Sequence, residues 1–263
     1  MDLVSLSRGL GTRWMGHDLE VYSVIGSTNR RLKDRLLRFE PPAGAAVVAD
    51  SQTEGRGRLG RQWWSPPGRG LYTSFAVYPP ASQVAGILSL LAGVAVAKAL
   101  TMAGPGVAAR LKWPNDVVIG GLKCAGILVE GGLAPRPWAV IGIGVNVNGP
   151  IAGYLAHATS LSDWVGEPVD RSTLWQNIAG QLERYYDDWQ TQGNAGILRA
   201  WTECSATLGR QVVVRSGHET WEGLAESVDD DGALWLRRED GIRQRVASGE
   251  VSVRMADGRY APD

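Results

Sequence analysis

The pattern of apolar residues changes near residue 206, and this change constrains the fold more than any other feature of the sequence. Before it, apolar positions recur at helical spacing over long segments, as Leu174, Ile178 and Leu182 do. After it, short alternating runs are separated by tight turns such as Asp231-Gly232. We therefore expect an α+β fold of two domains, with residues 1–205 forming the larger one and residues 206–263 a small β-barrel.

The larger region alternates segments typical of strands with segments typical of helices. Helices are expected after Ser27, with Leu32, Leu36 and Phe39 on one face, and over residues 82–103 and 171–203, the last of these restarting after Gly193. This order favours a mixed β-sheet flanked by helices. The predicted strands are residues 18–25, 45–50, 71–78, 107–113, 117–119, 123–130 and 138–147, followed in the small domain by 211–215, 219–227, 233–237 and 242–247.

The segment Gly55-Arg56-Gly57-Arg58-Leu59-Gly60-Arg61 lies between two predicted core strands and carries three positive charges. It is too rich in glycine to form a stable helix or strand, and glycine lets the backbone approach a ligand closely. Each guanidinium offers a planar set of donors suited to carboxylate or phosphate oxygens. We interpret the segment as a mobile loop that closes over an anion, rather than as a solvated turn.

Composition and charge exclude several classes of protein. Lysine and arginine (27) balance aspartate and glutamate (27), so the chain has no overall positive field for nucleic acid or an anionic membrane. The two cysteines, Cys124 and Cys204, are too few for a disulfide scaffold. The longest apolar stretch, residues 84–97, is shorter than the about 20 residues that span a membrane, and the N-terminus lacks the apolar core of a signal peptide. We expect a cytoplasmic protein.

The sequence lacks the familiar motifs for nucleotides, metals and serine nucleophiles. The glycine-arginine segment has no Gly-Lys-Ser/Thr ending, and Gly142-Ile143-Gly144 has no third glycine of a dinucleotide fingerprint. The histidines have no metal-ligand spacing, so we expect no resident metal, and all three are placed in loops or on the surface: His17, His157 and His218. Cys124 is expected in the core, because strand alternation puts it opposite Lys123.

Four further features have both a structural and a functional interpretation. Residues 27–29 (Ser-Thr-Asn) are either a plain helix cap or a polar binding site. Residues 112–116 (Lys-Trp-Pro-Asn-Asp) are either a turn or a site, and Lys123 is either a solvated strand lysine or a site residue. Gly142 and Gly144 leave gaps in a predicted strand, which suggests a ligand lying directly against the sheet.

Taken together and in order, these motifs resemble those of the biotin protein ligases. The segments that carry the resemblance are STN at 27–29, QTEGRGRLGRQW at 52–63, KWPND at 112–116, KCAGILVE at 123–130, GIGVNVN at 142–148 and TSL at 159–161. The resemblance implies a catalytic domain of the class II synthetase type and, from the strands that end in SGEVSVR, an SH3-like C-terminal domain. Members that also regulate transcription carry an N-terminal helix-turn-helix domain, for which too few residues precede the first predicted strand, so the chain resembles the monofunctional class.

The resemblance implies an ATP-dependent ligase that makes biotinyl-5′-adenylate and transfers the biotinyl group to a lysine of the biotin carboxyl carrier protein of a carboxylase such as acetyl-CoA carboxylase. The implied biotin-binding residues are Ser27, Thr28, Asn29, Gln52, Arg56, Gly57, Arg58, Lys123, Gly126, Ile127 and Leu128. The implied ATP- and adenylate-binding residues are Gly55, Arg56, Arg58, Arg61, Trp63, Asn115, Lys123, Asn146 and Asn148.

Three residues are implied to be catalytic: Lys123, Arg58 and Asp116. Lys123 and the arginines would reduce the repulsion between the biotin carboxylate and the phosphates. Lys123 would then donate to the oxyanion of the transfer step, while Asp116 orients or deprotonates the acceptor lysine. Mg²⁺ would arrive with ATP, because the sequence shows no carboxylate cage for it.

Two alternatives stay open at this stage. A lipoate-type acyl-adenylate ligase would need a longer apolar tunnel and would not be expected to carry GRGRxGRxW together with KWPND. A nucleic-acid-binding module would use the glycine-arginine segment and the C-terminal barrel, but a single basic segment on a net-neutral chain offers little surface for it. We expect a carrier protein as partner, no nucleic-acid or membrane partner, and a monomer or a homodimer.

Overall fold

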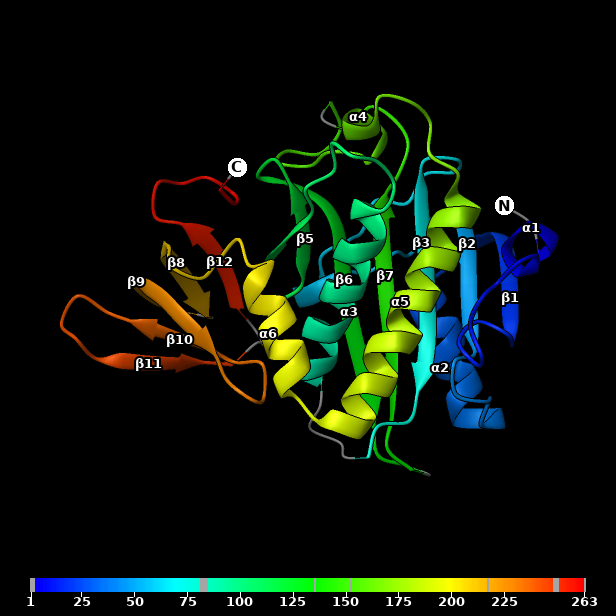
Figure 1. Cartoon of the computed structure of the whole chain (residues 1–263), viewed down its shortest axis with the longest axis horizontal. Helices are drawn as coiled ribbons and strands as arrows, with labels where there is room; N and C mark the ends of the chain where they lie inside the picture. Colours follow the sequence, from blue (N-terminus) through cyan, green and yellow to red (C-terminus); the bar gives the residue numbers. More distant parts are fainter. Residues whose placement is uncertain are drawn as a thin grey trace.

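The computed structural model describes residues 3–80, 85–134, 136–151, 153–216, 218–247 and 251–262. A mixed sheet of seven strands carries helices on both faces, and a second sheet of five strands lies beside it (Figure 1). None of the helices formed by these residues is both long and apolar enough to cross a membrane. The elements are α1 (Leu3–Ser7), β1 (Leu19–Ile25), α2 (Thr28–Phe39), β2 (Ala46–Gln52), the 3₁₀ turn η1 (Arg58–Gly60), β3 (Gly70–Val77), α3 (Ala85–Thr101), β4 (Arg110–Lys112), β5 (Asp116–Ile119), β6 (Leu122–Gly132), β7 (Trp138–Asn146), α4 (Ser162–Val165), α5 (Arg171–Gln192), α6 (Ala195–Glu203), β8 (Gln211–Ser216), β9 (Glu219–Val228), β10 (Leu234–Arg237), β11 (Arg243–Val246) and β12 (Val251–Met255).

The large sheet has the strand order β1-β2-β3-β7-β6-β5-β4. β1 and β2 pair in parallel, and all the other neighbours pair antiparallel. β3 and β7 form the centre and pair along the whole of β3, from Gly70 opposite Asn146 to Val77 opposite Ala139. Both strands are buried along nearly their full length, which explains why their sequences are almost continuously apolar. The expected mixed sheet flanked by helices is confirmed.

Different helices cover the two faces of this sheet. α3 and α5 pack against each other on one face, where Phe75 and Ile141 join the main core (Figure 1). α2 covers the other face, where Leu32 and Leu36 pack with Val140. Because side chains alternate along a strand, the even-numbered residues of β7 point toward the face that carries α2. The pocket described below opens on that face.

The predicted helices and strands are present, except that residues 82–84 of the helix expected over 82–103 lie outside the described residues. Other differences in extent have local causes. Ser27 caps α2 as expected, and helical spacing puts Phe39 on the face of Leu32 and Leu36, but as the last residue of the helix Phe39 is 73% exposed. The strand expected over residues 107–113 is reduced to β4, since Val107 belongs to a turn in which its N–H donates to the carbonyl of residue 104.

The C-terminal strands form an antiparallel sheet with the order β11-β10-β9-β8-β12. The expected short strands joined by tight turns are confirmed, but the expected closing of these strands into a barrel is not found among the described residues. Within the described residues β11 and β12 are edge strands that do not pair with each other, so the SH3-like sheet is open rather than closed into a barrel. Gly232 and Gly241 have φ angles of 79° and 80°, which the turns before and after β10 require.

The turn before β10 docks on the large sheet's helices. The indole Nε1 of Trp113 donates to the carbonyl oxygen of Gly232 at 3.0 Å. A Cβ atom added to Gly86, near the start of α3, would lie 2.0 Å from the carbonyl oxygen of Asp231. The main chain of the turn therefore rests directly on the main chain of α3, at a position where only glycine leaves room.

Candidate functional site

A pocket of about 250 Å³ opens on the face of the sheet that carries α2. Its walls come from the start of α2, the end of β2, the glycine-arginine segment, strands β5 to β7, the loop at residues 155–158 and the C-terminal unit. The predicted site residues that line it are Ser27, Thr28, Asn29, Gln52, Arg56, Gly57, Arg58, Arg61, Trp63, Asn115, Asp116, Lys123, Gly126, Ile127, Leu128 and Asn146.

One part of the pocket is a set of hydrogen-bonded polar side chains at the start of α2. The Oε1 atom of Gln52 accepts from the backbone N–H of Thr28 at 2.9 Å. Ser74 on β3 donates to the Oδ1 atom of Asn29 at 2.6 Å, and the Nδ2 atom of Asn29 donates to Glu130 at 3.0 Å. These contacts hold the amides and hydroxyls in defined orientations, as recognition of a small polar ring requires.

Three glycines on β6 and β7 make room for larger side chains from elsewhere. A Cβ atom on Gly142 would lie 2.0 Å from Oδ1 of Asn29, and one on Gly144 would lie 2.5 Å from Cε2 of Trp63. A Cβ atom on Gly126 would lie 2.9 Å from Cζ3 of the same indole. Asn29 and Trp63 thus occupy the space that side chains at Gly142 and Gly144 would need, while both glycines still line the pocket. The expectation that a ligand lies against the sheet at this point stays a prediction.

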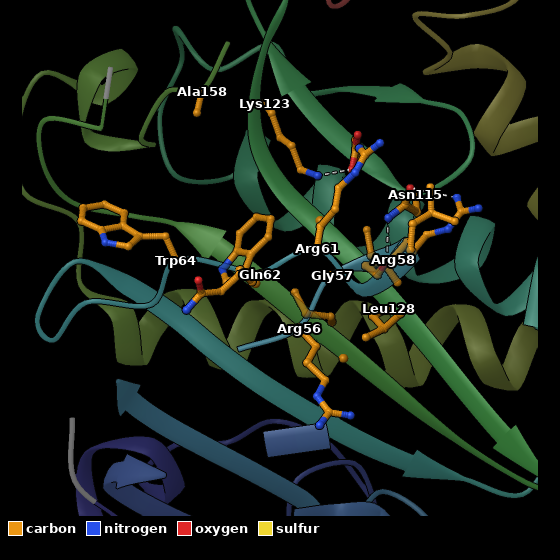
Figure 2. A pocket seen from close by; sticks show the side chains of 18 of the residues that line it. Arg56, Gly57, Arg58, Arg61, Gln62, Trp64, Asn115, Lys123, Leu128 and Ala158 are labelled. Carbon is orange, nitrogen blue, oxygen red and sulfur yellow. Dashed lines mark hydrogen bonds and ion pairs between the residues drawn. The ribbon is translucent and has the colours of Figure 1, made fainter. Parts of the chain in front are cut away.

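Another part of the pocket holds a cluster of charges around Asp116. Lys123 Nζ lies 2.5 Å from Oδ1 of Asp116, and the hydroxyl of Tyr260 donates to Oδ2 of the same carboxylate. Lys123 Nζ also lies 5.2 Å from the centre of the Trp63 ring. Figure 2 shows Lys123 and Arg61 pointing toward the same part of the pocket, whereas Arg56 points away from it. Cations from separate elements thus converge where an anion would be bound.

Burial and neighbouring charges set the protonation of this cluster. Burial alone would raise the pKa of Asp116, but the positive charges of Lys123 and Lys112 hold that pKa below its usual range. Burial lowers the pKa of Lys112 to about 8, although Asp116 opposes this shift. Asp116 is therefore an anion at neutral pH, whereas Lys112 sits close to its titration point.

The glycine-arginine segment folds over the sheet as a tight loop. Gly57 N–H donates to the carbonyl of Arg61 at 2.7 Å, and η1 lies between them. Arg58 is half-buried, and its Nη1 atom donates to Oδ1 of Asn115 at 3.1 Å (Figure 2). Asn115 in turn donates to the carbonyl of Ile127 at 2.8 Å. Arg58 thus ties the loop to the strands that carry the charge cluster.

Two predicted residues lie outside the pocket lining. Gly55 is buried beneath the loop, where a Cβ atom would lie 2.5 Å from the carbonyl oxygen of Trp63. The Oδ1 atom of Asn148 accepts from the backbone N–H of Val169 at 2.8 Å, and its Nδ2 atom donates to the carbonyl of Val169 at 2.9 Å. Gly55 therefore shapes the loop, and Asn148 holds a neighbouring segment rather than facing the pocket.

Several lining residues were not assigned a role from the sequence. Among them are Leu59, Gln62, Trp64, Lys112, His157, Arg254 and Tyr260. Lys112 lies in the KWPND motif and Arg254 at the end of SGEVSVR, so both had a signal in the sequence, whereas nothing near Tyr260 indicated it. His157 lies exposed in a loop as expected, yet also reaches the pocket. Among the described residues no group of three or more His, Cys, Asp or Glu side chains is arranged to hold a metal ion.

Comparison with known families gives two matches. Residues 21–148 match the "Biotin/lipoate A/B protein ligase family". Residues 207–254 match the "Biotin protein ligase C terminal domain". The first match spans most of the large sheet and the second most of the C-terminal sheet.

Individual relatives and solved structures agree with these matches. The chain is 37% identical over 252 residues to the "Bifunctional ligase/repressor BirA" of Bacillus spizizenii, covering 93% of this chain and 77% of that protein. It is 38% identical over 215 residues to the "Biotin--[acetyl-CoA-carboxylase] ligase" of Paracoccus denitrificans, covering 79% of this chain and 89% of that protein. The structure of "Biotin protein ligase from Aquifex aeolicus in complex with biotin and ATP" is similar with a TM-score of 0.79 and 29% identity, covering 91% of this chain and all of the other.

Proposed function

The chain belongs to the biotin protein ligases, and from this premise we infer that its pocket joins biotin to ATP and passes the biotinyl group to a lysine of a biotin carboxyl carrier protein. One observation supports this most strongly. A fixed set of amides and hydroxyls at the start of α2 and a cluster of cations around Asp116 share one pocket, with Trp63 packed over the sheet within it. A vitamin with a polar ring at one end and a carboxylate at the other fits that arrangement.

We propose specific roles for the side chains that bind biotin. Ser27, Thr28, Asn29 and Gln52 hydrogen-bond the ureido ring. Leu128 contacts the apolar body together with the backbone of Gly57, Gly126 and Ile127, since the Ile127 side chain itself packs in the main core. The carboxylate then points toward Arg58 and Lys123, and Arg56, which also lines the pocket, is proposed to contact biotin from the loop. The hydrogen bonds among Gln52, Thr28, Asn29 and Ser74 support this assignment, because they fix donors and acceptors before a ligand arrives.

In the first half reaction a carboxylate oxygen of biotin attacks the α-phosphorus of ATP, and pyrophosphate leaves. Both reactants are anions, so the main barrier that the protein lowers is their repulsion. Lys123 and Arg61 approach this region from β6 and from the loop, and Lys112 lies beside them. Trp63, Asn115 and Asn146 are proposed to contact the adenylate. Mg²⁺ enters with ATP as part of the substrate.

In the second half reaction the amine of the carrier lysine attacks the acyl carbon of the mixed anhydride, and AMP leaves. Lys123 is placed to donate to the oxyanion that forms. Of the two roles expected for Asp116, the lowered pKa favours orienting the incoming amine, because a carboxylate that holds its charge strongly is a weak base. The carboxylate is also already engaged by Lys123 and Tyr260.

The acceptor, the domain organisation and the location of the protein are proposed from a relative and from the sequence. A relative named as an acetyl-CoA-carboxylase ligase supports the carrier protein of such a carboxylase as the acceptor. We propose that the catalytic unit comprises residues 1–205 and the SH3-like unit residues 206–263. We further propose a cytoplasmic protein that acts as a monomer or homodimer without a nucleic-acid or membrane partner, since its charges balance.

The direct test is to incubate the protein with biotin, ATP, Mg²⁺ and a biotin carboxyl carrier domain, and to measure the mass of the carrier. The expected product carries one biotinyl group on one lysine. A parallel reaction with lipoate separates biotin ligation from lipoate ligation. A carrier that gains lipoyl mass and no biotinyl mass would contradict the proposal.

Lys123 can be tested separately through the first half reaction. We expect Lys123→Ala to lose biotin-dependent exchange of pyrophosphate into ATP by more than about 100-fold, since a charge placed at the reacting phosphate contributes several kcal/mol. Lys98→Ala, an exposed lysine on α3, serves as the control. Wild-type exchange in Lys123→Ala would remove Lys123 from the chemistry.

A further inference from the structure

Tyr260 reaches the charge cluster from the C-terminal unit and contacts several of its members. Its hydroxyl donates to Oδ2 of Asp116. Lys112 Nζ lies 4.2 Å from the centre of its ring, and the guanidinium carbon of Arg254 lies 4.7 Å from it. The ring of His157 stacks on it at 5.9 Å with an interplanar angle of 16°. One side chain thus contacts β4, β5, β12 and the 155–158 loop.

The chain on either side of Tyr260 holds it in place. After β12, the N–H of Gly258 donates to the carbonyl of Met255 at 3.0 Å, and Gly258 has a φ angle of 83°, so the chain reverses direction there. After Tyr260, Ala261 is buried with Val118 on β5 and Ala206. The tyrosine therefore lies in a segment anchored to the same strand that carries Asp116.

The contacts of Asp116 indicate what Tyr260 contributes. One carboxylate oxygen meets Lys123 and the other meets Tyr260, so the two partners fix the plane of the carboxylate from opposite oxygens. The backbone of Lys123 is held by the same loop on which Tyr260 stacks, because Lys123 N–H donates to the carbonyl of His157 at 2.8 Å. Without the hydroxyl, the buried carboxylate would keep Lys123 as its partner but lose the contact that sets its orientation.

Building on the proposed function, we propose that Tyr260 is a positioning residue of the ligase reaction: its hydroxyl fixes the Asp116 carboxylate, and through it the ammonium of Lys123 that meets the reacting groups. The ring also covers the buried ammonium of Lys112, which is only 3% exposed. A residue of the C-terminal unit thereby sets the geometry of the charge cluster on the large sheet. Its loss affects the rate of the chemical step, while biotin recognition at the start of α2 stays intact.

The test compares Tyr260→Phe with Tyr22→Phe. The first removes the hydroxyl on Asp116 and keeps the ring. The second removes a hydroxyl that donates to Glu20 at 2.9 Å, the same kind of bond in a strand that contributes no residue to the pocket lining. For Tyr260→Phe we expect kcat of biotin-dependent pyrophosphate exchange to fall about tenfold, as for the loss of one hydrogen bond to a charged group, with KM for biotin unchanged. Tyr22→Phe is expected to match the wild type in both constants.

Biotin affinity measured by calorimetry provides a second readout, because an intact Tyr260→Phe protein should bind biotin as the wild type does. A Tyr260→Phe enzyme with wild-type kcat would overturn the inference, and so would one in which KM for biotin rises in proportion to the loss of kcat. A faster enzyme or a lower KM for ATP would show that the tyrosine obstructs the site, which also overturns it. If the wild-type protein shows no exchange at all, the proposed function fails and the inference falls with it. If the wild type is active and Tyr260→Phe has the same kcat, the inference about Tyr260 is wrong while the proposed function stands.

Discussion

The indole of Trp63 occupies the space directly above Gly144, so closely that a Cβ atom at position 144 would lie 2.5 Å from Cε2 and 2.6 Å from Nε1. The indole is fixed from its own chain as well, because the N–H of Trp63 donates to the carbonyl of Gly55 at 2.9 Å. The depth of the pocket at this point is therefore set jointly by a glycine of the central strand and a tryptophan of the loop.

This packing predicts that Gly144→Ala displaces the indole. We expect the free energy of unfolding to fall by about 1–3 kcal/mol, as for other overpacked sites, and ATP affinity to fall with it. Urea unfolding and calorimetric titration measure the two effects. Gly180→Ala is the control: its Cβ would meet nothing within 4 Å, and replacing a helical glycine should stabilise α5 by about 0.5–1 kcal/mol. A Gly144→Ala protein with wild-type ATP affinity would contradict the role given to Trp63.

Replacing Arg58 should loosen the loop without destroying adenylate synthesis. Arg58→Gly removes the hydrogen bond to Asn115 that ties the loop to β5. We expect the variant to make biotinyl-5′-adenylate but to release it, because the water-excluding cover over the anhydride is weakened. Mass spectrometry of an added bystander protein should then show biotin on many lysines. Labelling confined to the carrier lysine would refute the prediction.

The buried Lys112 predicts a loss of activity in alkaline solution. Its pKa of about 8 means that the ammonium is charged below pH 8 and neutral above it. Since ATP phosphates favour the charged form, kcat/KM for ATP should fall as the pH rises through about 8, toward a tenfold loss for each further pH unit. The Lys112 ammonium is influenced by the charges of four neighbours: Asp116, which favours the charged form, and Lys123, Arg61 and Arg254, which oppose it.

Lys112→Arg is the matched variant for this prediction, because arginine keeps its charge throughout the range. In the Lys112→Arg variant, the fall of kcat/KM for ATP should occur at higher pH than in the wild type, whatever the maximal rate of the variant. Identical alkaline limbs in the two enzymes would assign the loss of activity to another group.

Cys124 should be chemically inert in the folded protein. Burial raises the pKa of its thiol, and the side chain is fully buried in the main core. In a Cys204→Ser variant we therefore expect no alkylation by iodoacetamide under native conditions and complete alkylation in denaturant. Rapid native alkylation would show that the core at β6 opens.

Local features of the fold could be predicted because their causes are local. The cap at Ser27, the apolar α3 and the hairpin before β6 follow from short stretches of sequence. The exposure of Phe39 could not be predicted, because periodicity gives the helix face that a residue shares but not where the helix ends. The pairing of β3 with β7 could not be predicted, since it joins segments that are distant in the chain and no local pattern encodes that contact.

The residues of the candidate site also divide into those that the sequence predicted and those that depend on contacts between distant segments. The order of the motifs predicted which residues from β2, β6 and β7 would gather, and the structure brings most of them together. The sequence showed the gaps at Gly142 and Gly144 but not that Asn29 and Trp63 fill them, because a sequence shows that space exists and not which side chain occupies it. Tyr260 was missed for a further reason: it reaches the pocket from the second sheet, and only the docking of the two sheets gives it that place.

The contact of Gly86 with the turn at Asp231 has a consequence for how such an enzyme can change over time. At Gly86 the joint is made of main-chain atoms, so no larger residue can be placed there without displacing the turn, and the Trp113 indole holds the same turn through the carbonyl of Gly232. A change in the length of the turn would shift the five-stranded sheet, and with it Arg254 on β12 at the pocket. The spacing of this joint and the position of that arginine are therefore linked in evolution.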